Sequence, residues 1–362
     1  MNLSKMKLLL HPSIFWHGRC MYDYAVQAMQ FFYTASGCDI SFTGTSLEAT
    51  ILSKPHDDRL RQAHLLVFVD GQMVEDATTL FVLDQYENSI PLVSGLKPGA
   101  HQVRIFKRSE AFDSSTWIKK LQTDGTFIPH CSPIKPMIQF IGASVSTGYG
   151  NMGRLGEIKS TSNSNGFRAF STQTALFLDE DIEIIGASGW GVFQGYNTLM
   201  GVSSTQTIPN AYDYAGIDDT FLIKESLGLY SHQRHPKVIV LNLGSNDFYS
   251  SDYVNQPSSF QELITKRFID HYTTFVMHLQ QVHLGATIFI TTGLMSEPTF
   301  ITDPLEKIII QLHQKGIVVY PFVFKSAKEL GHSVAVDGHP NVQTHYQAAL
   351  DLGLYIKKML KK

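Results

Sequence analysis

The sequence predicts a two-part α/β protein, in which a β-sandwich precedes a parallel sheet covered by helices on both faces. The chain has 362 residues, more than the length at which a single hydrophobic core usually stops growing. Its first third contains short strand-like runs separated by turn residues, whereas the rest alternates apolar strands with helical stretches. The chain therefore changes architecture about one third of the way along.

Residues 14–112 are expected to form the β-sandwich. Runs such as AHLLVFV and QVRIFK have the composition and spacing of half-buried strands. Turn formers such as Asp70-Gly71 and Pro98-Gly99 separate these runs. Several strands in succession, without a helix between them, favour two packed sheets.

Residues 113–134 show no sustained period and carry turn formers, so we place the linker there. Residues 135–362 then read as one α/β domain, because strands that are apolar throughout are buried on both faces. An irregular insertion is expected at 190–236. The expected strands are 136–142, 182–189, 237–244, 287–293 and 318–324, and the expected helices lie around 166–179, within 260–283, within 304–315 and around 342–360.

Charge and composition exclude several classes of partner. The formal net charge is -3, which provides no electrostatic reason to expect nucleic acid or an anionic membrane surface. No apolar run approaches the length of a membrane span. The first sixteen residues make a poor signal peptide, because His11 and Pro12 interrupt the apolar stretch, so localisation stays unassigned. The oligomeric state is likewise not predicted.

Three cysteines, Cys20, Cys38 and Cys131, are too few for a disulfide framework. Free thiols are the expectation, and a single Cys20–Cys38 bridge stays open. None of the cysteines belongs to a CxxC pair, and the histidines show no metal-ligand spacing, so no zinc site is expected.

Residues that offer polar groups follow the apolar parts of the first three expected strands of the second domain: Ser144 follows 136–142, Gly189 follows 182–187 and Asn246 follows 237–243. A fourth, His339, lies just before the last expected helix. Because the carboxyl ends of parallel strands meet at one edge of a sheet, we expect these residues to lie close together.

The four residue types suit one reaction. A serine hydroxyl becomes a nucleophile when a base takes its proton, and histidine is the usual base. Ser144 and His339 supply that pair. The oxyanion formed on attack needs fixed donors, for which the backbone N–H groups of Ser144 and Gly189 and the amide of Asn246 are the candidates. Alone, each residue has a simpler explanation, such as a helix N-cap or a turn; together they favour a serine hydrolase.

The motifs around these residues resemble those of carbohydrate esterase family two. The stretch IGASVSTGYGN (141–151) is similar to its nucleophile block, SGWG (188–191) to its oxyanion glycine block, GSND (244–247) to its GTND block, and DGHPN (337–341) with His345 to its DxHPN...H block. In the first third, FTGTSL (42–47), VDG (69–71), GAH (99–101) and KRSEA (107–111) resemble the jelly roll that precedes the esterase domain of that family.

The resemblance implies a jelly roll followed by a flavodoxin-like SGNH hydrolase domain. It implies an esterase that removes acetyl groups from polysaccharides or oligosaccharides of the xylan or glucomannan type by an acyl-enzyme mechanism, without metal or organic cofactor. Members of the family are often secreted, so the resemblance suggests an extracellular protein.

Two departures from the family pattern affect the expected site. Ala143 stands where the family commonly has Asp, so we expect altered rather than abolished activity. Asp337 precedes His339 by two residues, whereas the wider SGNH group usually spaces the acid three before the histidine. Two interpretations stay open: Asp337 completes a catalytic triad, or Ser144 and His339 act as a dyad.

Two alternative functions stay open at this point. The same chemistry could act on a lipid or a small ester, as in other GDSL enzymes, or the chain could be a catalytically silent carbohydrate-binding protein, which the change at Ala143 would explain. Aromatic residues in the long insertion could stack on sugar rings or pack within the loop, and none is assigned a role.

Overall fold

The computed structural model describes residues 2–4, 11–54, 59–76, 78–130, 132–197, 201–295 and 299–361. The chain divides into two compact units. The first consists of Met1–Ile134, Ser160–Gly166 and Tyr214–Leu229; the second consists of Lys135–Lys159, Phe167–Asp213 and Tyr230–Lys362.

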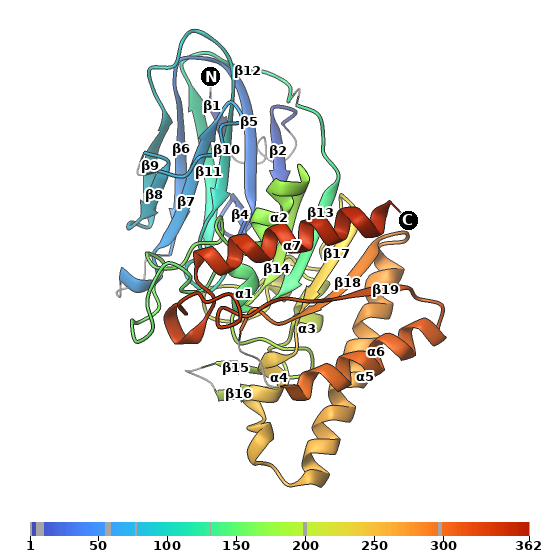
Figure 1. The fold of residues 1–362 in the computed structure, drawn as a ribbon. Coiled ribbons are helices and arrows are strands. Elements are labelled where there is room, and N and C mark those ends of the chain that lie inside the picture. The colour runs from blue at the N-terminus through green and yellow to red at the C-terminus, as the bar shows by residue number, and fades with distance from the viewer. Residues whose placement is uncertain are drawn as a thin grey trace. The chain divides into compact units, whose positions relative to one another are not determined.

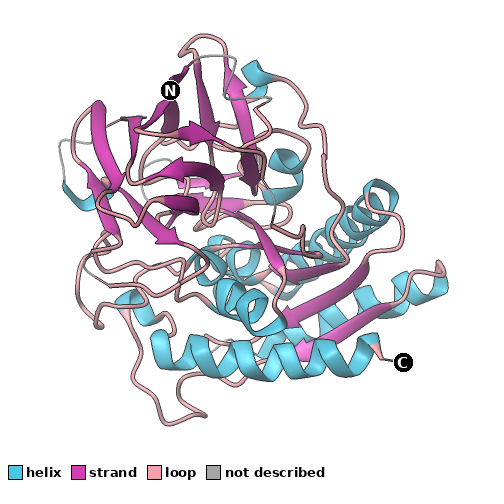
Figure 2. Ribbon diagram, turned by 90° about the horizontal axis from the view of Figure 1, so that it is seen from above, coloured by secondary structure: helices cyan, strands magenta, loops and turns pink. Residues whose placement is uncertain are grey.

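The first unit contains two antiparallel sheets (Figures 1 and 2). One has the order β3-β4-β11-β6-β9, with β1 also paired to β11; the other has the order β12-β5-β10-β7-β8, with β2 also paired to β5. The strands are β1 (Asn2–Ser4), β2 (Ile14–His17), β3 (Cys20–Asp23), β4 (Ala28–Phe31), β5 (Gly37–Gly44), β6 (Leu47–Ser53), β7 (Ala63–Val69), β8 (Leu80–Leu83), β9 (Glu87–Val93), β10 (Gly99–Lys107), β11 (Thr116–Thr123) and β12 (Thr126–Phe127). The expectation of packed antiparallel sheets is confirmed.

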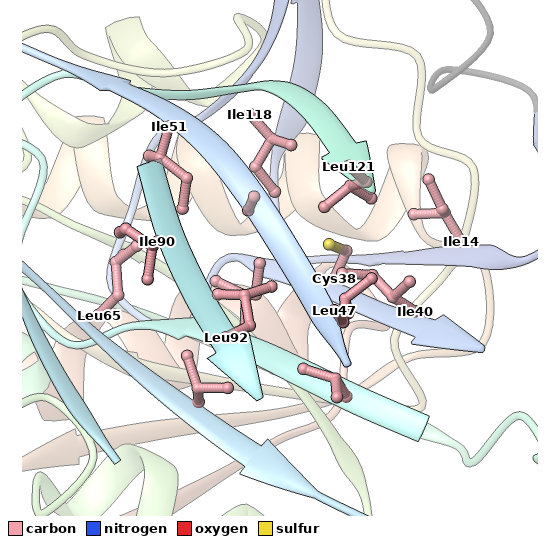
Figure 3. Packing of buried hydrophobic residues seen from close by; sticks show 14 of the residues in the cluster. Ile14, Cys38, Ile40, Leu47, Ile51, Leu65, Ile90, Leu92, Ile118 and Leu121 are labelled. Atoms are coloured by element: carbon pink, nitrogen blue, oxygen red, sulfur yellow. The ribbon is translucent and has the colours of Figure 1, made fainter. Parts of the chain in front are cut away.

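Apolar side chains from both sheets pack together in a buried cluster (Figure 3). In β9, for example, Ile90 and Leu92 are buried while their neighbours along the strand are exposed, as the two-residue period of a strand requires. Ile51 and Ile118 join them from neighbouring strands of the same sheet, and Leu65 from the other sheet.

Strand β11 lies inside the stretch 113–134, which the sequence predicted as the linker. It pairs with β4 on one side and β6 on the other. A register shift between Ile118 and Lys120 interrupts its alternation, which explains why the sequence shows no sustained period there. Cys20 and Cys38 are free thiols, so the bridge that the sequence left open is absent, and Cys131 lies outside the described residues.

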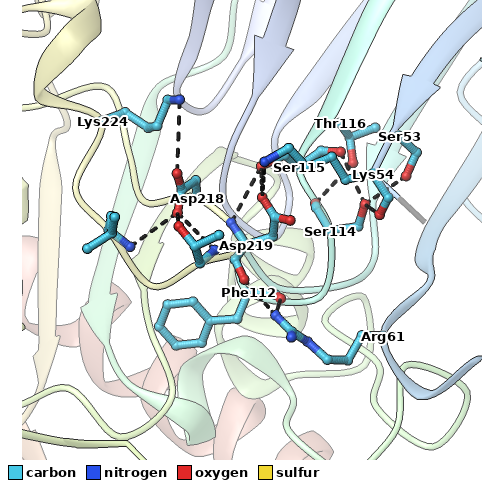
Figure 4. Close-up of polar contacts among 12 residues, drawn as sticks. Ser53, Lys54, Arg61, Phe112, Ser114, Ser115, Thr116, Asp218, Asp219 and Lys224 are labelled. Atoms are coloured by element: carbon cyan, nitrogen blue, oxygen red, sulfur yellow. Dashed lines mark hydrogen bonds and ion pairs between the residues drawn. The ribbon is translucent and has the colours of Figure 1, made fainter. Parts of the chain in front are cut away.

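Two segments from later in the chain are held in the first unit by polar contacts. In the segment Tyr214–Leu229, buried Asp219 accepts a hydrogen bond from Ser115 Oγ at 2.7 Å and faces Lys54 Nζ at 3.4 Å (Figure 4). Burial opposes ionisation of this carboxyl, but Ser115 and Lys54 hold its pKa below the usual value. The guanidinium of Arg61 donates to the backbone carbonyl of Asp219 at 2.7 Å.

The second segment, Ser160–Gly166, is held by Arg108. Its buried guanidinium donates to the carbonyls of Thr161 at 3.0 Å and Ser164 at 3.1 Å, and it pairs with Glu75 at 3.3 Å. Asn165 also donates to Glu75, at 2.7 Å. Both segments therefore belong structurally to the first unit although they follow residue 135 in the sequence.

The second unit is built on a parallel sheet of order β14-β13-β17-β18-β19, with helices on both sides (Figure 2). Its strands are β13 (Met137–Gly142), β14 (Asp181–Gly186), β17 (Val238–Asn242), β18 (Thr287–Thr292) and β19 (Val319–Val323), with a separate hairpin of β15 (Gly195–Asn197) and β16 (Gly201–Ser203). Its α-helices are α1 (Ser144–Thr147), α2 (Phe170–Leu178), α3 (Ile208–Tyr212), α4 (Ser245–Ser250), α5 (Ser258–Val282), α6 (Thr302–Gln314) and α7 (Val342–Leu360). The predicted parallel sheet is confirmed.

In chain order, the strands of this sheet run 2-1-3-4-5, so the connection reverses direction between β13 and β17. In doubly wound sheets a ligand site forms beyond the carboxyl ends of the strands at such a reversal. Among the described residues, no helix is both long enough and apolar enough to cross a membrane.

Candidate active site

Ser144 lies immediately beyond the central strand of the parallel sheet. Strand β13 ends at Gly142, and Ser144 is the first residue of α1. Ala143 occupies the N-cap position and makes no side-chain capping bond, so the helix start depends on the backbone bond from Ser146 N–H to Ala143 O at 3.0 Å. Ser144 is half-buried.

His339 meets Ser144 as the sequence predicted, although 195 positions separate the two. The distance from Ser144 Oγ to His339 Nε2 is 2.8 Å. On the other side of the ring, Nδ1 lies 3.1 Å from the backbone carbonyl of Val336. Because a carbonyl can only accept, Nδ1 must carry the hydrogen, and Nε2 then presents its lone pair to the serine hydroxyl.

Burial lowers the pKa of His339 below its usual value, and the Val336 carbonyl and the charge of Asp337 oppose that shift only in part. A lowered pKa keeps the imidazole neutral at mildly acidic pH. The ring is therefore in the protonation state that a general base needs.

The carboxylate of Asp337 is hydrogen-bonded to Tyr149 rather than to the imidazole. The Tyr149 hydroxyl donates to Asp337 Oδ2 at 2.8 Å, and the ring of Tyr149 stacks on His339 with centroids 4.5 Å apart. Asp337 has a φ of 50°, which turns this residue out of the regular helical path. Among the described residues, the hydrogen-bond partner of His339 Nδ1 is thus a carbonyl.

Sequence reasoning missed both Tyr149 and Val336 as members of the site. Tyr149 lies in the quoted GYGN block, so its place beside the nucleophile was a usable signal. Val336 contributes only a backbone carbonyl, which any residue could supply, and its side chain therefore carries no signal.

Gly189 follows β14 in the turn before the β15–β16 hairpin. Its φ is 80°, and a Cβ at this position would lie 2.1 Å from the carbonyl oxygen of Tyr196, so only glycine fits. Within the described ranges, neither the N–H of Ser144 nor that of Gly189 has a hydrogen-bond acceptor. Two unsatisfied N–H groups at one sheet edge are what an oxyanion site requires.

Asn246, the third predicted oxyanion donor, lies in the first turn of α4. Its amide donates one hydrogen bond to the backbone carbonyl of Trp190 at 2.9 Å. An amide nitrogen carries two hydrogens, so the second stays available for a ligand.

The neighbouring residue, Asp247, has a contact set that the sequence did not predict. Its buried carboxylate accepts from the N–H groups of Val192 at 2.9 Å, Phe193 at 2.8 Å and Gln194 at 3.3 Å. Burial raises its pKa to about 7, against the opposing effect of these hydrogen bonds.

The second histidine of the predicted motifs, His345, has a backbone partner. His345 is buried, its Nδ1 accepts from the N–H of Phe170 at 3.1 Å, and burial lowers its pKa to about 3. Within the part of the chain that the structure describes, no three His, Cys, Asp or Glu side chains are placed to hold a metal ion.

Several known proteins are similar to this chain in sequence. The family model described as "Carbohydrate esterase 2 N-terminal" matches residues 16–130. A cellulase/esterase, CelE, from Acetivibrio thermocellus is 26% identical over 358 residues, which cover 97% of this chain and 40% of that protein. An acetylxylan esterase / glucomannan deacetylase from Cellvibrio japonicus is 31% identical over 242 residues, which cover 64% of this chain and 63% of that protein. The chain therefore spans less than two thirds of the length of both relatives.

The fold has a solved counterpart as well. A family two carbohydrate esterase from Clostridium thermocellum, determined in complex with cellohexaose, superposes with a TM-score of 0.79 at 24% sequence identity. The alignment covers 96% of this chain and 99% of that one. The similarity extends over both units.

Proposed function

We propose that this chain, a relative of the family two carbohydrate esterases over nearly its whole length, is a serine esterase that removes O-acetyl groups from polysaccharides or oligosaccharides of the xylan or glucomannan type. The observation that carries the proposal is the 2.8 Å contact between Ser144 Oγ and His339 Nε2 beyond the carboxyl end of β13. The names of the relatives support the substrate class.

In the proposed reaction, Ser144 Oγ attacks the acetyl carbonyl while His339 Nε2 takes the hydroxyl proton. The tetrahedral intermediate collapses when His339 returns that proton to the departing sugar oxygen, which leaves an acetyl group on Ser144. Water activated by the same imidazole then attacks the acetyl-enzyme and releases acetate. No cofactor takes part in these steps.

The oxyanion of each intermediate would be held by the N–H groups of Ser144 and Gly189 and by the second hydrogen of the Asn246 amide. The absence of acceptors for both backbone N–H groups among the described residues supports this assignment. Donors already fixed in position stabilise the developing charge without reorganisation when the reaction occurs.

For the third member of the site we propose the backbone carbonyl of Val336, which fixes the ring of His339 through Nδ1. Asp337 acts on the imidazole through its charge and through Tyr149 rather than as the hydrogen-bonded acid of a triad. The site is then a Ser144–His339 dyad with a carbonyl in the place of the acid.

We also propose finer fold assignments than the sheets alone establish. The two antiparallel sheets of the first unit would form a jelly roll, and the parallel sheet with its helices a flavodoxin-like SGNH hydrolase domain. The 2-1-3-4-5 strand order and the family match over residues 16–130 support them.

The decisive experiment compares the wild-type protein with Ser144→Ala on 4-nitrophenyl acetate, acetylated xylan and acetylated glucomannan. We expect acetate release from all three substrates, a loss of about 10⁵-fold or more in the variant, and an acetyl adduct on Ser144 when turnover is quenched. Ser146→Ala is the matched control, because Ser146 lies in the same helix and its buried hydroxyl makes no hydrogen bond to His339.

Three results would contradict the proposal. Activity that persists in Ser144→Ala would show that Ser144 is not the nucleophile. A marked preference for acyl chains of about eight carbons or more would identify a lipid ester, rather than an acetylated carbohydrate, as the substrate. If the folded wild-type protein hydrolyses no ester, the chain is a carbohydrate-binding protein rather than an enzyme.

A further inference from the structure

Asp247 is a fully buried carboxylate that the proposed reaction does not use. Its side chain accepts hydrogen bonds from three successive backbone N–H groups, those of residues 192–194. Among the described residues, no lysine, arginine or histidine forms an ion pair with it. A buried carboxylate without a cation is costly, so its retention here calls for a specific role.

The backbone comes unusually close to this carboxylate. A Cβ on Gly191 would lie 2.4 Å from Asp247 Oδ2, so a side chain at this position would push the two apart. Oδ1 accepts from all three N–H groups, and Oδ2 shares that of Val192 at 2.9 Å. Rotating any of these peptides would cost a hydrogen bond in a dry environment.

The neighbouring residue holds the preceding part of the same turn. Asn246 donates to the carbonyl of Trp190 at 2.9 Å, and Tyr196 N–H donates to the carbonyl of Gly189 at 2.7 Å. Asn246 therefore binds the carbonyl of residue 190, and Asp247 binds the N–H groups of residues 192–194. The two side chains contact consecutive parts of the turn 189–194. The two peptides that directly follow Gly189 are thereby fixed.

We propose that Asp247 is a positioning residue for the oxyanion side of the site: its carboxylate gathers the N–H groups of 192–194 and so keeps the turn 189–194 in the conformation in which Gly189 N–H faces the reacting carbonyl. The inference rests on the proposed esterase function and deepens it. Asp247 itself touches no reacting atom, and its effect reaches the substrate through Gly189.

A carboxylate suits this position better than an amide of the same shape. Both oxygens of Asp247 act as acceptors, whereas an asparagine would offer one oxygen and turn two N–H hydrogens toward backbone donors. Asp247→Asn therefore keeps the volume and removes part of the acceptor set. Loss of a properly placed oxyanion donor lowers kcat by about 10²–10³-fold in serine hydrolases.

The test measures kcat and KM of Asp247→Asn with 4-nitrophenyl acetate and with acetylated xylan, with circular dichroism to show that the variant is folded. We expect kcat to fall by about 30- to 1000-fold while KM changes by less than about threefold, because ground-state binding does not use the oxyanion donors. Asp252→Asn is the matched control, since it makes the same change at an exposed aspartate shortly after Asp247 and should leave both constants unaltered.

A folded Asp247→Asn variant with kcat within about twofold of wild type overturns the inference, and so does an increase in KM at constant kcat. If the variant does not fold, amide hydrogen exchange of the wild-type protein decides: exchange of residues 192–194 as slow as in the core strands supports the inference, and exchange as fast as in an exposed loop overturns it.

Failure of the inference can be distinguished from failure of the proposed function. If Ser144→Ala abolishes activity while Asp247→Asn leaves kcat unchanged, the esterase function stands and only the positioning role of Asp247 is rejected. If the folded wild-type protein has no esterase activity, both proposals are rejected.

Discussion

Asp39 in the first unit and Asp247 in the second are both buried, yet their surroundings differ in kind. Arg104 binds Asp39 through two parallel contacts, at 2.6 Å to Oδ1 and 2.7 Å to Oδ2, and His17 Nε2 lies 3.0 Å from Oδ2. Burial alone would raise the pKa of Asp39, but the hydrogen bonds and charges of Arg104 and His17 hold it well below its usual value. Among the described residues, the carboxyl group of Asp247 has only backbone N–H partners, and burial raises its pKa to about 7.

The difference shows two ways in which this protein satisfies a buried carboxyl group. In the β-sandwich, Asp39 is paired with the guanidinium of Arg104 and the ring of His17. Beside the reaction site, no described residue supplies a cation to Asp247, and the histidine that meets Ser144 is held by a carbonyl instead of a carboxylate. Departures from the rules of core packing are expected at functional sites, where reactive groups must stay available.

The largest expected effect comes from removing the arginine that pairs with Asp39. Arg104→Met leaves the carboxylate of Asp39 buried without its main cation, which should cost about 3–5 kcal/mol of unfolding free energy in urea titrations at pH 7. The specific activity of the molecules that stay folded should not change. The double variant Asp39→Asn/Arg104→Met should recover part of the loss, and a loss below about 1 kcal/mol would show that Asp39 does not depend on this pairing.

The second effect concerns the pH dependence of stability. Between the usual carboxyl pKa of 3.8 and the raised value of about 7, folded Asp247 holds a proton that the unfolded chain has released. Its contribution to stability therefore falls as pH rises through this window, by at most about 1.4 kcal/mol per unit. Urea unfolding of wild type and Asp247→Asn from pH 4.5 to 8 should show this slope only in the wild type.

Asp39 should behave in the opposite sense. Its lowered pKa stabilises the fold fully above pH 3.8, and this contribution is lost only as the pH falls below that value. Parallel slopes for wild type and Asp247→Asn between pH 4.5 and 8 would mean that the Asp247 carboxyl ionises as readily in the folded state as in the unfolded chain.

The contrast between these two aspartates could not be predicted from sequence, although the main features of the fold could. Strands such as β17, apolar along nearly their whole length, predicted a parallel sheet because both faces must be covered. Ser144 and His339 could be paired across 195 positions because strand ends meet at one sheet edge and each residue lies in a recognisable motif.

What the sequence could not predict depends on contacts between distant residues. Nothing local to Asp219 indicates that Ser115 and Lys54 hold it in the first unit. The spacing of Asp337 and His339 left a triad open, and only the left-handed backbone at Asp337 directs its carboxylate to Tyr149. Asp247 was visible only as the last residue of a GSND motif, because its partners are backbone N–H groups that have no side-chain signature.

A third, smaller effect tests whether the carbonyl of Val336 takes the place of an acid. Because burial lowers the pKa of His339, the midpoint of the acidic limb of kcat/KM should lie below the usual histidine pKa of 6.5. The negative charge of Asp337 raises that pKa, so Asp337→Asn should move the acidic limb to still lower pH. At the plateau, kcat should fall by less than about tenfold.

Asp337→Asn tests whether His339, like His17 beside Asp39 in the first unit, depends on a carboxylate partner. If Asp337 instead orients the imidazole directly, Asp337→Asn should cost on the order of 10⁴-fold in kcat, as loss of a triad aspartate does. Tyr149→Phe is the matched control, because it removes the hydrogen bond to Asp337 while leaving the carboxylate charge and the aromatic ring in place.

The smallest effect concerns Ala143, where a new carboxylate would stand at the start of the helix that carries the nucleophile. Ala143→Asp should supply the missing N-cap acceptor to α1 and raise the unfolding free energy by about 0.5–1 kcal/mol. Its charge would also lie next to the site of the developing oxyanion and partly offset any benefit from a better ordered Ser144, so kcat should change by less than about fivefold. Ala143→Asn provides the same cap without the charge. If the Asn variant is stabilised and faster while the Asp variant is stabilised but slower, then ordering of the helix start speeds the reaction and the added negative charge opposes it.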